Sequence, residues 1–221
     1  RDIDARMDRT HWRPLPSGKT KPNEAFVLGL ILSAAGVIWA FKLAPIYSAV
    51  IFAGLFFDVI VYTVWLKRRT CWSIIWGGIS GGMPILAGRA LATGHLDWIG
   101  MALSLAVLFW IPTHMMTFSM RYADDYQKAG VPTFPSRYGY QATRIVIAVS
   151  SILAAFFIGI ASFGIGIGFG YLRVFGVLSL GLMTLAVLSL IKKSDKVNFG
   201  LFKYASLYML SAMIIMMLGA L

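Results

Sequence analysis

Residues 45–66 read PIYSAVIFAGLFFDVIVYTVWL, an apolar run in which Asp58 is the only charged side chain. A helix needs about 20 such residues to cross the hydrocarbon core of a bilayer, so the run predicts a membrane-spanning helix. An unpaired carboxylate inside a span costs about 2.5 to 3.5 kcal/mol on insertion scales. We therefore expect Asp58 to face a polar cavity or to be protonated.

The same kind of run recurs along the whole chain. Hydrophobic residues make up 58% of the sequence, charged residues 13%, and the mean hydropathy is +0.75. Because soluble domains are about one quarter charged, this composition excludes an ordinary soluble fold. We predict an all-α polytopic transmembrane bundle forming one domain over residues 1–221, with seven spans at 25–41, 45–66, 72–92, 97–118, 144–165, 171–191 and 203–221.

The cysteine count and the first residues set further limits. Cys71 is the only cysteine, which excludes an internal disulfide and a cysteine-based metal cage. The first residues do not read as a signal peptide. A chain that starts on Arg1 suggests that it begins inside a longer protein.

The basic residues gather on one side of the predicted spans. Seventeen of the twenty Lys and Arg residues fall before the first span or in the loops on the same side. By the positive-inside rule this side is cytoplasmic, which predicts a multi-pass protein of the plasma or inner membrane. The net charge of +11 then indicates anionic lipid headgroups or anionic substrates as partners, and not nucleic acid.

Two acidic clusters lie within this basic side. Asp2, Asp4 and Asp8 precede the first span, while Asp124 and Asp125 follow the fourth. Carboxylates that face one another across a basic rim suit a divalent cation together with a multiply charged anion, such as Mg²⁺ with a diphosphate. The alternative is a pair of solvated loops whose acids offset their neighbouring cations.

Each acidic cluster has its own pattern. Asp4 and Asp8 are four residues apart, so on a helix they would share one face and could share a cation, with Arg9 and Arg13 close behind. The second cluster lies in RYADDYQKAGVPTFPSRYG, residues 121–139, where Arg121 and Lys128 flank the two aspartates. Its aromatic side chains favour packing over full solvation; they are Tyr122, Tyr126 and Phe134.

Three further features lie inside the spans. His114, in FWIPTHMMTFSM (109–120), is a candidate for chemistry because ionisable groups in spans are functional by default; a packed, hydrogen-bonded histidine is the alternative. Arg89 lies near the outer end of its span, where we expect it to snorkel. The glycines of WGGISGGMP predict close helix packing; they are Gly77, Gly78, Gly81 and Gly82.

Several of these residues together resemble a known signature. The pattern of Asp4, Met7, Arg9, Thr10, Arg13 and Gly18 is similar to the end of the first aspartate-rich motif of the UbiA superfamily of membrane prenyltransferases. Members have nine spans, with that motif after the second, which implies that the first two helices are lacking here. Within the superfamily, MDRTHWRPLPSG, VYTVWLKRRT, GGISGGMPILAG and residues 110–139 most resemble the haem o synthase branch. The resemblance covers about residues 1–140.

The resemblance implies an activity and a set of roles. Members of that branch transfer a farnesyl group from farnesyl diphosphate to a vinyl group of haem b, with Mg²⁺ and within the lipid bilayer. By analogy Asp4 and Asp125 would bind the metal, supported by Asp8 and Asp124, and the diphosphate contacts would be Arg9, Arg13, Lys67, Arg121 and Lys128. Trp65, Trp110 and Tyr62 would stabilise the prenyl cation through their ring faces, with simple packing as the alternative for each. His114 would orient the porphyrin or bind its iron.

Some details leave alternatives open. The branch shows two prolines before its histidine and an aromatic after it, whereas Thr113 precedes His114 here and Met115 follows. Another UbiA-type enzyme, acting on a quinone precursor or another lipid acceptor, is therefore an alternative. A transporter is a third, although it should place ionisable residues near the midplane, where only Asp58 comes close. A haem a synthase partner does not follow from the sequence.

Overall fold

The computed structural model describes residues 1–220, and every regular element in that part of the chain is a helix. The predicted all-α fold is confirmed. η1 is a single 3₁₀ turn, and η2 is a π-helix that continues α2. In chain order the elements are η1 (Asp4–Arg6), α1 (Pro22–Leu43), α2 (Pro45–Phe56), η2 (Phe57–Leu66), α3 (Ser73–Thr93), α4 (Trp98–Arg121), α5 (Ala123–Lys128), α6 (Phe134–Ile165), α7 (Phe169–Lys192) and α8 (Asp195–Gly219).

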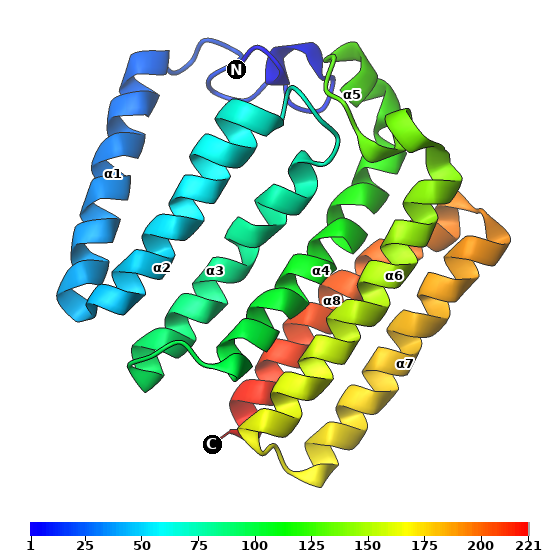
Figure 1. The fold of residues 1–221 in the computed structure, drawn as a ribbon. Coiled ribbons are helices and arrows are strands. Elements are labelled where there is room, and N and C mark those ends of the chain that lie inside the picture. The colour runs from blue at the N-terminus through cyan, green and yellow to red at the C-terminus, as the bar shows by residue number, and fades with distance from the viewer. Residues whose placement is uncertain (221) are drawn as a thin grey trace.

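The long helices lie side by side, and successive helices run in opposite directions (Figure 1). We call one end of the bundle the loop end; it carries residues 1–21, 67–72, 122–133 and 193–194. Short turns join the helices at the opposite end, where the C-terminus also lies (Figure 1). The two segments that hold the acidic clusters therefore share one end of the molecule.

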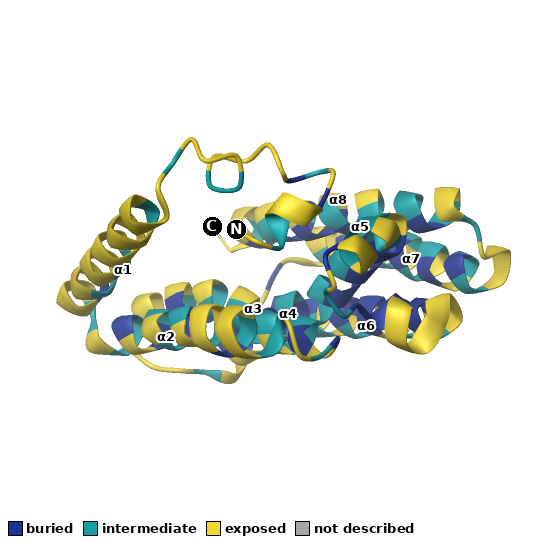
Figure 2. Ribbon diagram, turned by 90° about the horizontal axis from the view of Figure 1, so that it is seen from above, coloured by how far each residue is buried: buried dark blue, intermediate teal, exposed yellow. Residues whose placement is uncertain are grey.

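The core is formed by α4, α6, α7 and α8. Side chains such as Ala106, Ile147 and Leu201 are completely buried there. Figure 2 shows these buried residues concentrated in the same four helices, whereas α1 stands apart and is exposed along most of its length. In α1 only Ala40 is buried.

Among residues 1–220, six helices are long and apolar enough to cross a membrane. They begin at Pro22, Pro45, Trp98, Phe134, Phe169 and Asp195. The remaining predicted span, 72–92, forms the 21-residue helix α3, whose glycines and serines lower its hydropathy. The structure thus supports a multi-pass membrane protein, and the count of seven spans stays a prediction.

Two predicted spans start eight or more residues earlier in the structure than in the sequence analysis. α8 begins at Asp195 rather than at residue 203, because Lys196 and Asn198 extend the helix beyond its apolar part. The last residue of the predicted span, Leu221, lies outside the described residues. The helix predicted at 144–165 begins at Phe134, with a break at Gly139, whose φ of 80° separates a first short segment from the long one.

Helix ends follow ordinary sequence signals. Pro22 and Pro45 begin α1 and α2, where the missing N–H of proline is not needed. Gly94 and Gly166 end α3 and α6 with φ of 77° and 80°, a conformation that favours glycine. Thr133 caps α6 through its side chain. These residues set where each helix begins or ends, and so where the chain turns at each end of the bundle.

η2 changes the register of the helix that begins as α2. A π-helix has a wider turn than an α-helix, and π segments are frequent at functional sites. Within η2, Tyr62 is half-buried, whereas Asp58 is exposed and its carboxylate makes no hydrogen bond to any of residues 1–220. The wider turn therefore decides which side of this helix Tyr62 occupies.

Arg89 extends to the turn between α3 and α4, where it meets a carboxylate, and the snorkelling expectation stays a prediction. Its Nε and a terminal nitrogen donate to Asp97 at 3.0 and 2.7 Å. Asp97 also caps α4 by accepting the backbone N–H of Gly100 at 2.8 Å. The hydrogen bond from Arg89 and then that from Gly100 lower the pKa of Asp97. One carboxylate thus ties the end of α3 to the start of α4.

Replacing Asp97 with alanine is expected to lower the free energy of unfolding by about 2 kcal/mol, since it removes a helix cap and leaves Arg89 unpaired. Asp97→Asn keeps a cap acceptor and should lose less. Because the folded pKa lies below the unfolded value of 3.8, this stability is present at neutral pH and is lost as acid protonates Asp97. Thermal unfolding in detergent at pH 7 compares the stabilities of the wild type, Asp97→Asn and Asp97→Ala. Equal losses of stability in the two variants would contradict the capping role.

Candidate active site at the loop end

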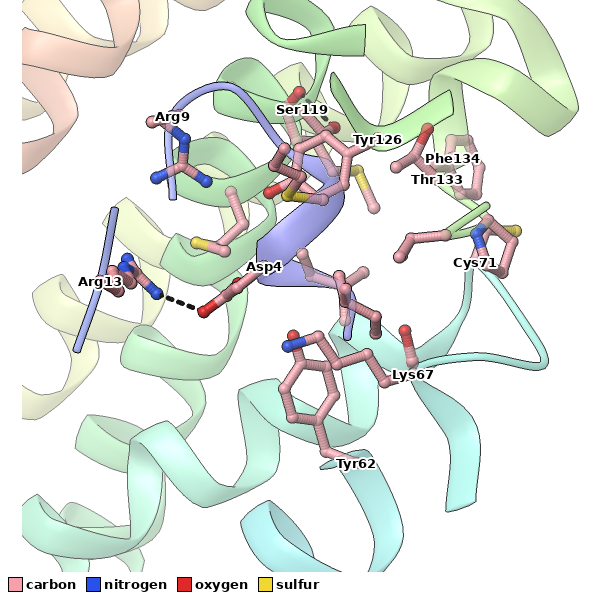
Figure 3. Close-up of a pocket in the computed structure, with 18 residues that line it drawn as sticks. Asp4, Arg9, Arg13, Tyr62, Lys67, Cys71, Ser119, Tyr126, Thr133 and Phe134 are labelled. Carbon is pink, nitrogen blue, oxygen red and sulfur yellow. Dashed lines mark hydrogen bonds and ion pairs between the residues drawn. The ribbon is translucent and has the colours of Figure 1, made fainter. Parts of the chain in front are cut away.

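A pocket at the loop end is formed by parts of the chain that are far apart in sequence. The N-terminal segment supplies Asp4, Arg9 and Arg13. Tyr62 comes from η2, and Lys67 directly follows that helix. The other walls come from α4, with Met115, Met116 and Ser119, and from the segment from α5 to α6, with Tyr126 and residues 131–134. Figure 3 shows these side chains turned toward one another. The pocket joins the N-terminal segment to the α5 segment.

Three cations and one carboxylate line this pocket. Arg13 donates to the Asp4 carboxylate at 3.1 Å (Figure 3). Arg9 and Lys67 are in no ion pair with residues 1–220, and the Nε of Arg9 is buried without a hydrogen-bond partner there. A site with excess positive charge and an unused N–H donor favours a multiply charged anion such as a diphosphate.

Aromatic rings hold Arg9 in place. Its guanidinium lies 4.7 Å from the ring centre of Phe118 and 5.4 Å from that of Tyr122. Such cation–π contacts fix a guanidinium without using its N–H groups. Thr10 is almost fully buried and donates to the backbone oxygen of Asp4 at 2.9 Å. The N-terminal segment is therefore held by the contacts of Arg9 with two rings and by the hydrogen bond of Thr10 to Asp4.

The helix expected to pair Asp4 with Asp8 is not formed. The 3₁₀ turn η1 ends at Arg6, and Met7 is extended. Consequently Asp4 pairs with Arg13, whereas Asp8 pairs with Lys128 at 2.7 Å. The two carboxylates do not share one helix face because the helical turn stops before Asp8.

Two exposed ion pairs connect the N-terminal segment to other loops. Arg68 donates twice to Asp2, at 2.7 and 2.8 Å, and this hydrogen bonding lowers the pKa of Asp2 to about 2. The hydrogen bond from Lys128 likewise lowers the pKa of Asp8 and raises that of Lys128. Both pairs join residues more than sixty positions apart, so they hold the segment across the pocket.

Asp124 and Asp125 occupy the first turn of α5. Neither lines the pocket, but the next residue, Tyr126, does. Burial raises the pKa of Tyr126; the charge of Arg9 opposes this, and the charges of Asp125 and Asp4 add to it. Asp4 and Asp125 thus act on the same phenol. Within residues 1–220, no three His, Cys, Asp or Glu side chains are arranged to hold a metal ion.

The comparisons with known proteins agree on the family. The family model described as "UbiA prenyltransferase family" matches residues 1–211. This chain belongs to the UbiA prenyltransferase family. The predicted family and enzyme class are confirmed, and membership excludes the transporter alternative.

Three curated relatives of this UbiA family chain are named as protoheme IX farnesyltransferases. A protoheme IX farnesyltransferase 1 from Picrophilus torridus is 38% identical over 222 residues, covering 99% of this chain and 74% of the relative. A protoheme IX farnesyltransferase from Pyrobaculum neutrophilum is 38% identical over 209 residues, covering 93% and 74%. One from Korarchaeum cryptofilum is 41% identical over 152 residues, covering 69% and 52%.

A solved structure supports the fold of this UbiA family chain. It was reported for a digeranylgeranylglyceryl phosphate synthase in membranes and matches with a TM-score of 0.81, covering 99% of this chain and 77% of the other. The two sequences are 20% identical, so this likeness supports the shared fold alone.

His114 does not line the pocket of this UbiA protein. Its ring lies between Trp110 and Phe202, with ring centres 4.8 and 4.5 Å away, and its Nδ1 is 3.2 Å from the hydroxyl oxygen of Ser206. The hydroxyl oxygen of Ser206 is also 2.9 Å from the backbone oxygen of Phe202. The ring of His114 is thus packed between aromatic rings and hydrogen-bonded, and which atom of the Nδ1–Ser206 pair donates depends on the tautomer.

Arg121 also lies away from the pocket. Its guanidinium is 4.1 Å from the ring centre of Phe199 in α8, on a different side of α4 from Ser119. Lys128 faces Asp8 outside the pocket. Of the cations predicted to contact a diphosphate, the pocket thus contains Arg9, Arg13 and Lys67.

Several pocket residues belong to no sequence motif that would have marked them as part of the site. Tyr126, Ser119 and Cys71 line the pocket; burial raises the pKa of the Cys71 thiol, which keeps it neutral. Gly77 is a further case, because a Cβ there would lie 3.1 Å from the ring of Tyr62. The predicted close packing at this glycine thus serves a side chain of the pocket.

Gly77→Ala is expected to raise the KM for the anionic substrate about 3- to 10-fold, since the Tyr62 ring must shift and small displacements in a site are costly. Gly88→Ala is a matched control in the same helix, because a Cβ there meets open space. Steady-state kinetics of both variants check this. A KM for Gly77→Ala equal to that of Gly88→Ala would contradict the positioning of Tyr62 by Gly77.

Proposed function

We propose that this UbiA family enzyme transfers a farnesyl group from farnesyl diphosphate to a vinyl group of haem b, giving haem o. The observation that carries the proposal is the pocket in which Arg9, Arg13 and Lys67 surround Asp4, with the Nε of Arg9 unpaired. The names of the relatives, each a protoheme IX farnesyltransferase, support farnesyl as the donor group and haem as the acceptor.

In the proposed reaction, the bond between C1 of the farnesyl group and the diphosphate oxygen breaks, and its electron pair leaves with the diphosphate. Arg9, Arg13 and Lys67 stabilise the charge on the departing oxygens. The vinyl group attacks the allylic cation and forms the new carbon–carbon bond. Water then adds to the resulting carbocation and loses a proton, which leaves the hydroxyl group of the product.

Side chains around the pocket have distinct proposed tasks. The ring face of Tyr62 stabilises the allylic cation, and the apolar walls at Met115 and Met116 keep water from reaching it early. Lys128 holds Asp8 and so fixes the N-terminal segment across the pocket. His114, held between Trp110 and Phe202, is proposed to orient the porphyrin or to ligate its iron.

The residues present fit Mg²⁺. Asp4 in the pocket and Asp125 beside Tyr126 are oxygen donors, and Mg²⁺ commonly binds through one or two carboxylates and substrate phosphates. Asp4 and Asp125 would hold the ion, with Asp8 and Asp124 in support. When bound, the ion supplies positive charge to the diphosphate oxygens. In this proposal Arg13, now on Asp4, becomes free to contact the diphosphate.

The proposed orientation places the loop end in the cytoplasm. The structure puts Lys42, Arg89 and Arg173 toward the opposite end, and the remaining seventeen cations at or near the loop end. The positive-inside rule then makes the loop end cytoplasmic, in a plasma or inner membrane. Farnesyl diphosphate would enter from that side with its chain in the bilayer.

The test is to express the full-length protein in a host that lacks its own haem o synthase and to extract the haems. We expect haem o, identified by mass, with the wild type and haem b alone with an empty vector. Haem b alone with a folded, membrane-inserted wild type would overturn the proposal. Adding a quinone precursor to the same membranes then shows whether the acceptor is of the alternative class.

A further inference from the structure

An aromatic ladder runs along the facing sides of α4 and α8. From α4 it contains Trp110, His114 and Phe118, followed by Tyr122 directly after the helix, all spaced four residues apart. From α8 it contains Phe202 and Phe199. His114 lies 4.5 Å from Phe202, Phe118 lies 4.5 Å from Tyr122, and Phe199 lies 5.5 Å from Phe202. All six rings are only partly buried, and a recess lined by Arg121 and Phe199 adjoins the ladder.

Cations gather where the ladder meets the loop end. Arg121 lies 4.1 Å and the Nζ of Lys203 lies 5.0 Å from the ring centre of Phe199. Neither cation is in an ion pair with any of residues 1–220. Asp195 lines the same recess as Arg121, but the two side chains do not form an ion pair. The end of the ladder therefore carries positive charge that no described carboxylate neutralises.

The ladder begins beside the pocket described above. Arg9 lines that pocket and also lies on Phe118 and Tyr122. The three α4 positions, from Trp110 to Phe118, extend over about 12 Å at 1.5 Å per residue. A planar conjugated ring system along the ladder would then have its acidic groups at the loop end, the same end as the pocket.

From this arrangement we infer that Arg121 and Lys203 bind the two propionate carboxylates of the acceptor, whose ring lies against the aromatic ladder. The inference rests on the proposed function and changes one expected role: Arg121 contacts the acceptor and not the diphosphate. The charges are complementary, since haem b carries two carboxylates, and the Phe199 end of the ladder carries Arg121 and Lys203. A third unpaired cation on the ladder, Arg9, lines the pocket. Bidentate guanidinium–carboxylate contacts are among the stronger hydrogen-bonded pairs.

The test compares the KM values of the two substrates in Arg121→Gln, Lys203→Gln and the double variant. We expect the KM for haem b to rise about 10-fold in each single variant and further in the double variant, while the KM for farnesyl diphosphate stays within about 2-fold. Lys196→Gln is the matched control, because Lys196 is an exposed lysine of α8 outside the ladder. A raised KM for farnesyl diphosphate alone, or an unchanged KM for haem b, overturns the inference.

A second probe separates this inference from the proposed function. Haem b and its dimethyl ester, whose carboxylates are blocked, are titrated into the wild type and the double variant, and absorbance in the Soret band reports binding without turnover. We expect the ester to bind the wild type about 10-fold or more weakly than haem b, with no such difference in the double variant. Equal binding of both ligands to the wild type overturns the inference even if haem o is made. Failure to make haem o, with the expected titrations, overturns the proposed reaction alone.

Discussion

Asp4→Asn is expected to lower kcat by about 100-fold or more. Asp4 supplies the only carboxylate among the residues that line the pocket, and it holds Arg13 at 3.1 Å. Without its negative charge, the proposed metal ion loses a ligand and Arg13 loses its partner. Removing one preorganised electrostatic group from an active site commonly costs two to three orders of magnitude in rate. Haem o formation in membranes at saturating Mg²⁺ measures the loss.

Asp2→Asn is the matched control for Asp4→Asn. Asp2 lies in the same segment and has its own arginine partner, Arg68, but does not line the pocket. It should keep most of the activity. Asp125→Asn should behave like Asp4→Asn, since both carboxylates are proposed to hold the metal. If Asp4→Asn retained a third or more of wild-type kcat, the role proposed for its carboxylate would be wrong.

Gly82→Ala is expected to destabilise the fold more than other small changes in α3. A Cβ on Gly82 would lie 2.6 Å from the backbone oxygen of Ser104 in α4, so the two helices would have to move apart. Overpacking of this kind costs roughly 1 to 3 kcal/mol, and more where backbone must shift. Small residues four apart, here Gly78 and Gly82, allow such close approach of membrane helices.

Detergent-solubilised protein unfolded by heat or by increasing SDS gives the comparison. Gly88→Ala again serves as control, because a Cβ there meets open space and alanine favours a helix. We expect the control to be as stable as the wild type or slightly more stable. A Gly82→Ala protein with the stability of the control would show that α3 and α4 do not depend on this contact.

The apolar runs predicted most of the fold. Helix lengths, the side on which the cations gather and the meeting of the two acidic segments at one end all follow from hydropathy and chain alternation. The sequence did not reveal the pairing of Arg89 with Asp97, because that contact depends on the turn between α3 and α4. From the sequence alone, the position of Arg89 near the end of a span indicates extension toward the membrane surface as well as it indicates an ion pair.

The candidate site was predictable in composition but not in detail. Asp4, Arg9 and Arg13 were recognisable from a motif, whereas Arg121, one residue before Tyr122, turned out to lie on Phe199 of α8. Four-residue spacing assumed one continuous helix through Asp8, and the chain leaves the helix at Met7. The place of Tyr62 depends on the π-helical register of η2, for which the apolar pattern gives no signal.

The isolation of α1 has a practical consequence for handling this enzyme. In the described part of the chain α1 packs mainly on α2 and buries only Ala40, so most of its surface is open to whatever surrounds the helix. Residues 14–21 connect it directly to the segment that carries Arg9 and Arg13. A detergent or a substitution that displaces α1 from α2 should therefore loosen the pocket at the loop end before it melts the core formed by α4, α6, α7 and α8.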